Sequence, residues 1–462
     1  MKTMLKTRPY ALVAILFLGV AAATCATAAE LKVPADYPTI QAAVDAAQTN
    51  DIIRIAPGVY TEQVRISTNK LTLIGQPGTI LRAAEQMVSF TSPFPDVQYV
   101  GVQMMLIELS DVTVRGLTFE GERLAEYFIG EGPMLGIFFS RSSGNVENCA
   151  FYGFREKTFG FEDASPIWVR TFEDDDVNVR VAGCTFADNY GAIFLRGGRI
   201  RQNITATIEN NTIVGLGPVA PDYNYSGIEI APGVGGRIAG NTISGFSYIG
   251  TTPGTGFPIS FGILASDNPV FSTLPPLVIE GNTFRDNQMH IALTKAGGSV
   301  IRNNRFQGSA PGIAPLGVVV SGTNITIADN QFEDMPEGIR LIGNDPLRDE
   351  LPALPLGDIL GFAINAQITS NRFCNVTTPI NRQSPATAAE TGTLLDACAS
   401  RPLVIAPAVL LSWPGDEDGW TLESATALDG PWAASDATPF KQSGRHAVAV
   451  PAQGDAKFFR LR

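Results

Sequence analysis

The chain has 462 residues, which is enough for one large core or for several ordinary domains. Asp and Glu number 45 against 33 Lys and Arg, so the formal net charge is -12, and only 17% of the residues are charged. This acidic balance disfavours nucleic acid as a partner, because a polyanion is bound by a basic surface.

The first 29 residues predict an export signal. Three basic residues at positions 2, 6 and 8 precede an apolar run over 10–23, and small residues follow at 26–29. This order is typical of a secretory signal peptide, and no later run is long and apolar enough to span a bilayer. We therefore expect residues 1–29 to be removed and the mature protein to be exported, without a transmembrane segment.

A short amphipathic helix is predicted next. Apolar residues at 40, 43, 44 and 47 follow helical spacing, and Thr39 is a suitable N-cap. Alternating segments at 51–55, 63–66 and 71–73 then indicate strands. A helix beside the first of many short strands is expected to cap an otherwise open sheet edge.

From this point to about residue 380 one motif recurs: an aliphatic residue, two spacers, usually Asn, one spacer, then Phe or Ile. Successive copies lie as little as 22 residues apart, too short for a β-propeller blade of about 40 to 50 residues. A second short strand, a small residue followed by alternating aliphatics, recurs within the copies. Stacked copies would pair in parallel about 4.8 Å apart, with the Asn side chains forming a ladder at a bend. The Asn slot holds Asn211, Asn241, Asn282, Asn304, Asn330 and Asn371, and in earlier copies Leu117, Cys149 and Cys184.

The region from about Val33 to Gln383 resembles the right-handed parallel β-helix, or pectin-lyase-like, superfamily. The resemblance rests on this repeat and on Tyr-Pro-Thr-Ile-Gln-Ala-Ala-Val-Asp-Ala-Ala at 37–47, Ala-Pro-Gly-Val-Tyr-Thr-Glu at 56–62 and Leu-Thr-Leu-Ile-Gly at 71–75. It implies an all-β fold, a right-handed parallel β-helix over 30–383 with an N-terminal capping helix. It implies no particular activity, because the superfamily includes lyases, hydrolases, esterases, epimerases and proteins without known activity. The catalytic stretches of pectin methylesterases and of polygalacturonases are missing, so no catalytic residue is transferred.

The repeat ends near residue 383, and the Thr-, Ala- and Ser-rich stretch 384–402 is predicted to be a linker. Residues 403–462 contain three of the four Trp and several alternating segments. They resemble a small β-sandwich module of bacterial secreted proteins. This resemblance implies a secreted protein, or one of the periplasm or cell envelope of a bacterium.

Four cysteines remain after removal of the signal. Cys374 and Cys398, at the edge of the repeat region, are predicted to form a disulfide that pins its last coil. Cys149 and Cys184 occupy the same slot in successive copies. They are either buried thiols of the ladder or a bridge between coils, and both interpretations stay open.

A candidate catalytic group is centred on His290, which stands where other copies have Gly or Ala before the strand aliphatic. Alignment of the repeats also places Asp267 level with Lys295. On one face, these three side chains could abstract a proton next to a uronate carboxyl group. The alternative is a surface ion pair beside a tolerated histidine.

Glu229 and Arg340 are expected to point outward from the same face and are candidate substrate-binding residues. The insertions 246–261 and 344–362 would either wall a groove on that face or cover an apolar patch that includes Phe138 and Phe194.

The acidic run Asp174, Asp175 and Asp176 is a candidate calcium site, since Ca²⁺ binds six to eight oxygen ligands. The alternative is an ordinary solvated acidic loop, so calcium is the one cofactor that the sequence suggests.

These observations predict an exported β-helix protein that binds or processes a polysaccharide or cell-surface glycan along one extended face. If it is an enzyme, the expected classes are polysaccharide lyase and glycoside hydrolase. The alternative is a non-catalytic cell-envelope or adhesion protein that uses the β-helix as a rigid scaffold.

Overall fold

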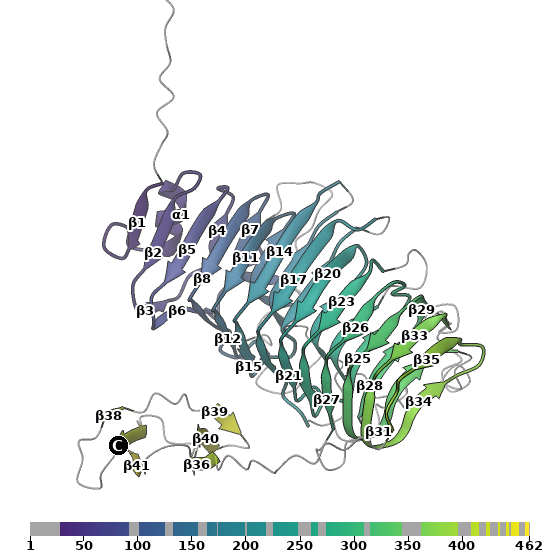
Figure 1. Cartoon of the computed structure of the whole chain (residues 1–462). Helices are drawn as coiled ribbons and strands as arrows, with labels where there is room; N and C mark the ends of the chain where they lie inside the picture. Colours follow the sequence, from purple (N-terminus) through teal and green to yellow (C-terminus); the bar gives the residue numbers. More distant parts are fainter. Residues whose placement is uncertain are drawn as a thin grey trace, which may run out of the picture. The chain divides into compact units, whose positions relative to one another are not determined.

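The computed structural model describes residues 28–91, 101–124, 133–155, 164–172, 174–198, 201–218, 225–247, 260–266, 274–308, 315–343 and 362–395, and six strand segments beyond residue 407. The chain divides into two compact units, Met1–Cys398 and Ala399–Arg462, which are described separately (Figure 1). The predicted signal peptide lies almost wholly outside the described residues.

One sheet of the first unit has 13 strands, each paired in parallel with the strand one coil further along the chain. This pairing gives every strand except the two at the ends of the sheet two neighbours, which short strands need because three to six residues are unstable alone. The strands, in spatial order, are β1 (Glu30–Val33), β2 (Ile52–Ile55), β5 (Leu71–Gly75), β8 (Asp111–Arg115), β11 (Ser143–Glu147), β14 (Val177–Ala182), β17 (Ile204–Glu209), β20 (Val234–Ala239), β23 (Leu277–Glu280), β26 (Val300–Arg302), β30 (Thr326–Ala328), β33 (Ala366–Thr369) and β35 (Ala388–Thr391).

A 20-stranded sheet contains two parallel columns. We call the first the Gly-strand column: β4 (Val64–Ile66), β7 (Val102–Glu108), β10 (Met134–Ser140), β13 (Ala164–Arg170), β16 (Ile193–Arg196), β19 (Tyr225–Ile230), β22 (Ser260–Ala265), β25 (Met289–Leu293) and β28 (Leu316–Val320). The second is the Phe-strand column: β3 (Gly58–Tyr60), β6 (Thr79–Arg82), β9 (Thr118–Glu120), β12 (Ala150–Tyr152), β15 (Thr185–Ala187), β18 (Thr212–Val214), β21 (Thr242–Ser244), β24 (Thr283–Arg285) and β27 (Arg305–Gln307). The long strands β31 (Gln331–Leu341) and β34 (Arg372–Arg382) run through both columns and join them.

The predicted N-terminal helix is present as α1 (Ile40–Ala46), and it packs against β1, β2 and β4. The Thr39 hydroxyl accepts a hydrogen bond from the Ala42 N–H at 3.0 Å, which confirms Thr39 as the N-cap. Ile40, Ala43 and Val44 are buried. Among the described residues, no helix is long and apolar enough to cross a membrane.

The interior is filled by the apolar residues of the repeat, which stack in register from coil to coil. The last motif residues align across the Phe-strand column, and neighbouring phenylalanine rings stack with centroids 4.7 to 5.0 Å apart. These last motif residues are all buried. The aligned residues are Phe119, Phe151, Phe186, Ile213, Ile243, Phe284, Phe306, Phe332 and Phe373.

The asparagines of the motif form a continuous buried ladder at the bend after the 13-stranded sheet. The Oδ1 of Asn282 accepts both the backbone N–H and the Nδ2–H of Asn241 at 2.9 Å. Its own Nδ2 donates to the Ile238 carbonyl at 2.9 Å and to Asn304 Oδ1 at 3.0 Å. The pattern repeats from Asn211 to Asn371, and the N–H of Cys184 extends it by one coil. These bonds satisfy backbone groups that the bend would otherwise leave unpaired in the interior.

The left-handed backbone conformation of the bend is adopted by the residue before each ladder asparagine, and not by the ladder residue itself. Positive φ angles of 56° to 65° occur at Asn210, Gly240, Gly281 and Asn303. Asn and Gly are the residue types that adopt this conformation most readily.

The parallel stacking continues beyond residue 383. β35 pairs with β33, so the predicted linker 384–402 begins with a strand of the 13-stranded sheet. β29 (Gly322–Thr323) and β32 (Ala363–Ile364) add a two-stranded parallel pair.

In the second unit the described strands form two antiparallel three-stranded sheets: β36 (Ala408–Pro414), β40 (Arg445–Pro451) and β39 (Phe440–Gln442), and β38 (Ala433–Ala434), β37 (Leu422–Ala425) and β41 (Phe458–Leu461). The described residues of both units are therefore mostly β-strand. A C-terminal β-sandwich is not evident from the two described sheets of the second unit.

Replacement of one ladder asparagine should destabilise the β-helix far more than replacement of its neighbour. Asn304→Ala removes two donors and one shared acceptor from a buried network, so we expect a loss of about 3 kcal/mol or more in the free energy of unfolding. Asn303→Gly keeps the left-handed bend and should change the free energy of unfolding by less than about 1 kcal/mol. Urea denaturation of both variants compares these values, and equal effects would contradict the ladder's role.

Candidate functional site

His290 is completely buried, so its predicted position on the solvent face is wrong. The register aligns it with Gly262 on β22 and Gly317 on β28. A Cβ atom at those glycines would lie 2.9 to 3.1 Å from a core phenylalanine ring, which shows that this strand position points inward. The histidine therefore occupies interior space, and its departure from the Gly pattern marks a change in core packing.

The environment of His290 is apolar on both sides. Its ring centroid lies 5.9 Å from that of Phe284 and 5.7 Å from that of Phe306, and Nδ1 is 3.1 Å from Asn287 Nδ2. Because the amide nitrogen donates, Nδ1 accepts and the ring is neutral. Burial lowers the pKa of His290 to about 3.

The other two members of the predicted catalytic group do not join His290. Lys295 lies in the turn after β25 with φ of 53°, half-buried, and its backbone N–H donates to Ser321 Oγ at 2.8 Å. Asp267 lies outside the described residues. No catalytic set of these three residues is therefore assembled in the part of the chain that the structure describes.

The described residues of the acidic run, Asp174 to Asp176, are not gathered into a calcium site. Arg141 binds both carboxylate oxygens of Asp175 at 2.7 and 3.0 Å, and Arg201 pairs with Asp176. Asp174 is exposed. The described residues contain no group of three or more His, Cys, Asp or Glu that could hold a metal ion. The run is thus an arginine-paired acidic loop.

The cysteines divide into two classes. Cys374 is disulfide-bonded, but Cys398 lies outside the described residues, so their pairing stays a prediction. Cys149 and Cys184 are free and buried in adjacent coils, which resolves the open alternative in favour of thiols. Burial raises the pKa of the Cys149 thiol well above its usual value.

Glu229 and Arg340 occupy the same outward register of the Gly-strand column, as predicted. The register from Glu229 passes through Leu264, Ala292 and Val319 to Arg340, four steps or about 19 Å away. Arg340 is bound by both carboxylate oxygens of Glu337, at 2.7 and 2.9 Å. The two candidates therefore share a face but lie apart. Of the insertions expected to wall this face, 246–261 and 344–362, all but the terminal residues 246–247, 260–261 and 362 lie outside the described part of the chain.

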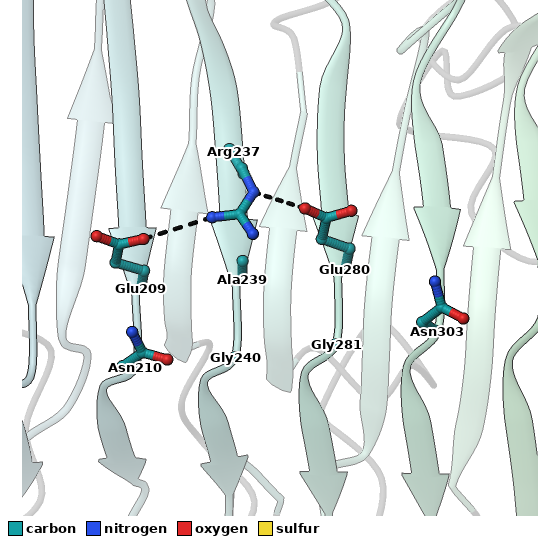
Figure 2. A pocket seen from close by; sticks show the side chains of 8 residues that line it. All are labelled: Glu209, Asn210, Arg237, Ala239, Gly240, Glu280, Gly281 and Asn303. Atoms are coloured by element: carbon teal, nitrogen blue, oxygen red, sulfur yellow. Dashed lines mark hydrogen bonds and ion pairs between the residues drawn. The ribbon is translucent and has the colours of Figure 1, made fainter.

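A shallow pocket of about 310 Å³ lies on the 13-stranded sheet (Figure 2). Figure 2 shows Arg237 between Glu209 and Glu280, at 3.4 and 2.6 Å. The pocket exists because Ala239 and the glycines at 240 and 281 provide little side-chain volume around these longer residues.

The charges of this pocket belong to an ion-pair ladder that crosses seven consecutive strands. Acid and base alternate, and each glutamate binds the arginines on both sides at 2.6 to 3.4 Å: Arg115, Glu147, Arg180, Glu209, Arg237, Glu280 and Arg302. Hydrogen bonds from Arg237 and Arg302 lower the pKa of Glu280. Because these groups neutralise one another, the pocket offers no unpaired charge to a ligand, and we regard it as part of the scaffold.

A different arrangement lies on the outward face of β13, β16 and β19. Trp168 and Phe194 are register partners whose ring centroids are 4.5 Å apart at an interplanar angle of 69°. Two residues further along the same strands, Arg170 and Arg196 are also register partners. Glu229 follows Phe194 on β19. We call Trp168, Arg170, Phe194, Arg196 and Glu229 the aromatic-arginine face.

This face is where an apolar column becomes accessible. Leu106, Leu135 and Phe138 on the two preceding strands are buried, whereas Trp168 and Phe194 are partly exposed. Large aromatic side chains retained at a partly exposed position are typical of binding surfaces. The sequence signal for the face is the pattern aromatic-x-Arg at 168–170 and again at 194–196, and of its five residues only Phe194 and Glu229 are singled out above.

Loss of Glu280 should weaken the ion-pair ladder modestly and in a salt-dependent way. Glu280→Gln removes two arginine contacts, so we expect a loss of up to about 1 kcal/mol in low salt that shrinks as salt is added. Since the folded pKa lies below the ordinary value of 4.5, the ladder's contribution is complete above that pH and is lost below it. Chemical denaturation across salt and pH, with exposed Glu85→Gln as the control, tests this. A salt-independent difference would contradict it.

His290 should make the protein sensitive to mild acid. Its pKa is about 3 in the folded chain and 6.5 in the unfolded chain. Between these pH values the unfolded chain binds more protons, so the free energy of unfolding falls as the pH drops below 6.5. The expected slope approaches about 1.4 kcal/mol per pH unit. In His290→Leu this part of the slope should vanish, as measured by urea denaturation from pH 7 to 4. His446→Gln, at the other histidine of the chain, should keep the wild-type slope.

Comparison with known proteins supports the fold. Residues 167–349 match the family model described as right handed beta helix region, and no curated protein matches the chain. Similar solved structures include an alginate lyase from Paenibacillus sp. str. FPU-7 (14% identity, TM-score 0.41, covering 77% of this chain and 91% of that one). The periplasmic alginate epimerase AlgG gives 13% identity and a TM-score of 0.47, with 75% and 77% covered. The GH136 lacto-N-biosidase from Eubacterium ramulus gives 12% identity and a TM-score of 0.45, covering 76% of this chain and 64% of that one. These are distant similarities of fold, and the repeat region of this chain is a right-handed parallel β-helix.

Proposed function

We propose that this chain is an exported protein that binds an extended polysaccharide along the outward side of the Gly-strand column, with the aromatic-arginine face as its main contact. The observation that carries the proposal is the partly exposed Trp168–Phe194 pair beside two arginines. We also propose that the N-terminal 29 residues direct export and that residues 403–462 form an accessory β-sandwich.

The chemistry of the aromatic pair suits a sugar ring. An aromatic side chain offers a broad apolar surface of fixed shape, and Trp adds a polar N–H at its edge. A pyranose ring is complementary, because its C–H groups form an apolar surface while its hydroxyl groups lie at the rim. The Nε1 of Trp168 is buried and has no hydrogen-bond partner among the described residues, so the exposed part of the indole ring is what a sugar would contact.

The extent of the column suits a polymer. From Trp168 on β13 to Arg340 on β31 the register passes six strand steps, about 29 Å at about 4.8 Å per step. Trp168, Phe194, Glu229 and Leu264 are partly exposed along the first part of this length, whereas Ala292 and Val319 beyond them are buried. The accessible strip therefore covers four neighbouring strands, β13 to β22, and an extended chain molecule can contact several of them at once.

We propose binding and leave a catalytic step outside the proposal. His290 is in the core, so of the predicted candidates for acid–base chemistry the described residues leave only Glu229 and Lys295. Glu229 lies on β19 and Lys295 in the turn after β25, so the two are two coils apart. This arrangement favours the binding function over a lyase mechanism that uses the histidine. Each glycan tested for binding should also be tested for turnover. Ultraviolet absorbance detects the unsaturated products of a lyase, and a reducing-sugar assay detects the new ends made by a hydrolase.

Replacement of either aromatic residue should weaken binding without unfolding the protein. Trp168→Ala and Phe194→Ala each take away a stacking surface, so we expect the affinity for the glycans that bind best on an array to fall about tenfold or more, equivalent to about 1.4 kcal/mol. Val59→Ala, an exposed apolar residue of the Phe-strand column, is the matched control and should bind like the wild type. Calorimetry measures the affinities, and circular dichroism confirms the fold. Wild-type affinity in both aromatic variants would overturn the proposed site.

A further inference from the structure

Arg170 and Arg196 place two positive charges side by side. They end β13 and β16 at the same register, so their backbones are about 4.8 Å apart. Both side chains point outward, because Val169 and Leu195 next to them are buried in the core. Both are half-buried. Two like charges this close and partly removed from water repel each other unless an anion lies between them.

Neither guanidinium has a carboxylate partner in the described part of the chain. The recorded contact of Arg170 is with an aromatic ring, its Cζ lying 5.4 Å from the centroid of Phe172. Asp175, in the loop that follows β13, is already bound by Arg141. The cost of the pair is visible in the pKa of Arg170, which burial and then the charge of Arg196 lower from the usual value.

Arginines in the ion-pair ladder of the 13-stranded sheet have acidic partners. On the 13-stranded sheet, Arg115, Arg180, Arg237 and Arg302 all bind glutamates at 2.6 to 3.4 Å. On this sheet, which we regard as scaffold, each of these arginines is thus paired with a glutamate of a neighbouring coil. An unpaired neighbouring couple beside the aromatic rings indicates a ligand that supplies the missing negative charge.

We propose that Arg170 and Arg196 form an oxyanion subsite, which binds a carboxylate or sulfate group on the sugar whose ring lies against Trp168 and Phe194. This inference rests on the proposed polysaccharide binding and names the chemical class of its ligand, an anionic glycan. Each guanidinium presents a planar fork of N–H donors that matches such a group. Arg170 follows Trp168 by two residues on one strand, about 7 Å, so a charged substituent of a stacked ring is within its reach.

The test compares polymers that differ in charge alone. Polygalacturonate and its carboxyl-reduced form report a carboxylate, and dextran sulfate and dextran report a sulfate. The variant is Arg170→Gln/Arg196→Gln, which shortens both side chains, keeps them polar and removes both charges. Arg285→Gln is the control, since Arg285 is an exposed arginine of the Phe-strand column that forms no ion pair within the described part of the chain. Affinities are measured by calorimetry at several salt concentrations.

We expect the wild type and Arg285→Gln to bind one acidic polymer about tenfold or more tightly than its neutral counterpart. The double variant should lose that preference and the salt dependence of binding, while its affinity for the neutral polymer stays unchanged. Whether polygalacturonate or dextran sulfate shows the effect identifies the group as carboxylate or sulfate. Equal affinities of the double variant and the wild type for the acidic polymer would overturn the subsite.

A second measurement separates this inference from the proposed function. Free glucuronate and free glucose 6-sulfate, at constant ionic strength with chloride as reference, should raise the Tm of the wild type but not of the double variant. If no polymer binds yet this Arg-dependent shift occurs, the polysaccharide function fails and the subsite stands. If polymers bind through Trp168 without any Arg-dependent selectivity, the function stands and the subsite fails. If neither effect occurs, both fail.

Discussion

The structure depends on the hydrogen-bonded asparagine ladder inside one bend of the coil. A parallel β-helix must turn its backbone in the interior, where an unpaired N–H or carbonyl group is costly. Each ladder asparagine meets that requirement for two coils at once, because Asn282 accepts from Asn241 and donates to Ile238 and Asn304. The ladder holds successive coils in one register, and the stacked Phe rings and the aligned outward residues follow from it.

With the register fixed, the outward faces of the two sheets have different properties. The 13-stranded sheet carries charges that neutralise one another from strand to strand, so its surface is satisfied without a ligand. The Gly-strand column carries a partly exposed aromatic pair and two arginines that have no acidic partner among the described residues. The charged groups of the first face have partners of opposite charge, whereas Arg170 and Arg196 of the Gly-strand column have none in the described part of the chain. This contrast is the physical basis for locating the function on the Gly-strand column.

The repeat in the sequence predicted the parallel stacking, the buried Asn and Phe positions and the N-terminal helix, because each depends on short-range periodicity. It misplaced His290, since periodicity alone does not tell where a strand bends so that consecutive residues, here His290 and Ile291, both face inward. Arg170 and Arg196 escaped notice for a related reason. Their significance is the lack of a partner, and partners are identified only when side chains from neighbouring coils are placed together.

The alternating ion-pair ladder also constrains how this protein can change in length. Loss or duplication of a single coil between Arg115 and Arg302 would bring two arginines or two glutamates onto neighbouring strands, at a cost in repulsion. Loss or duplication of two adjacent coils would keep the alternation intact. The asparagine ladder has no such preference, because its members are identical. The charge pattern therefore makes a pair of coils, and not one coil, the natural unit by which this part of the β-helix can grow or shrink.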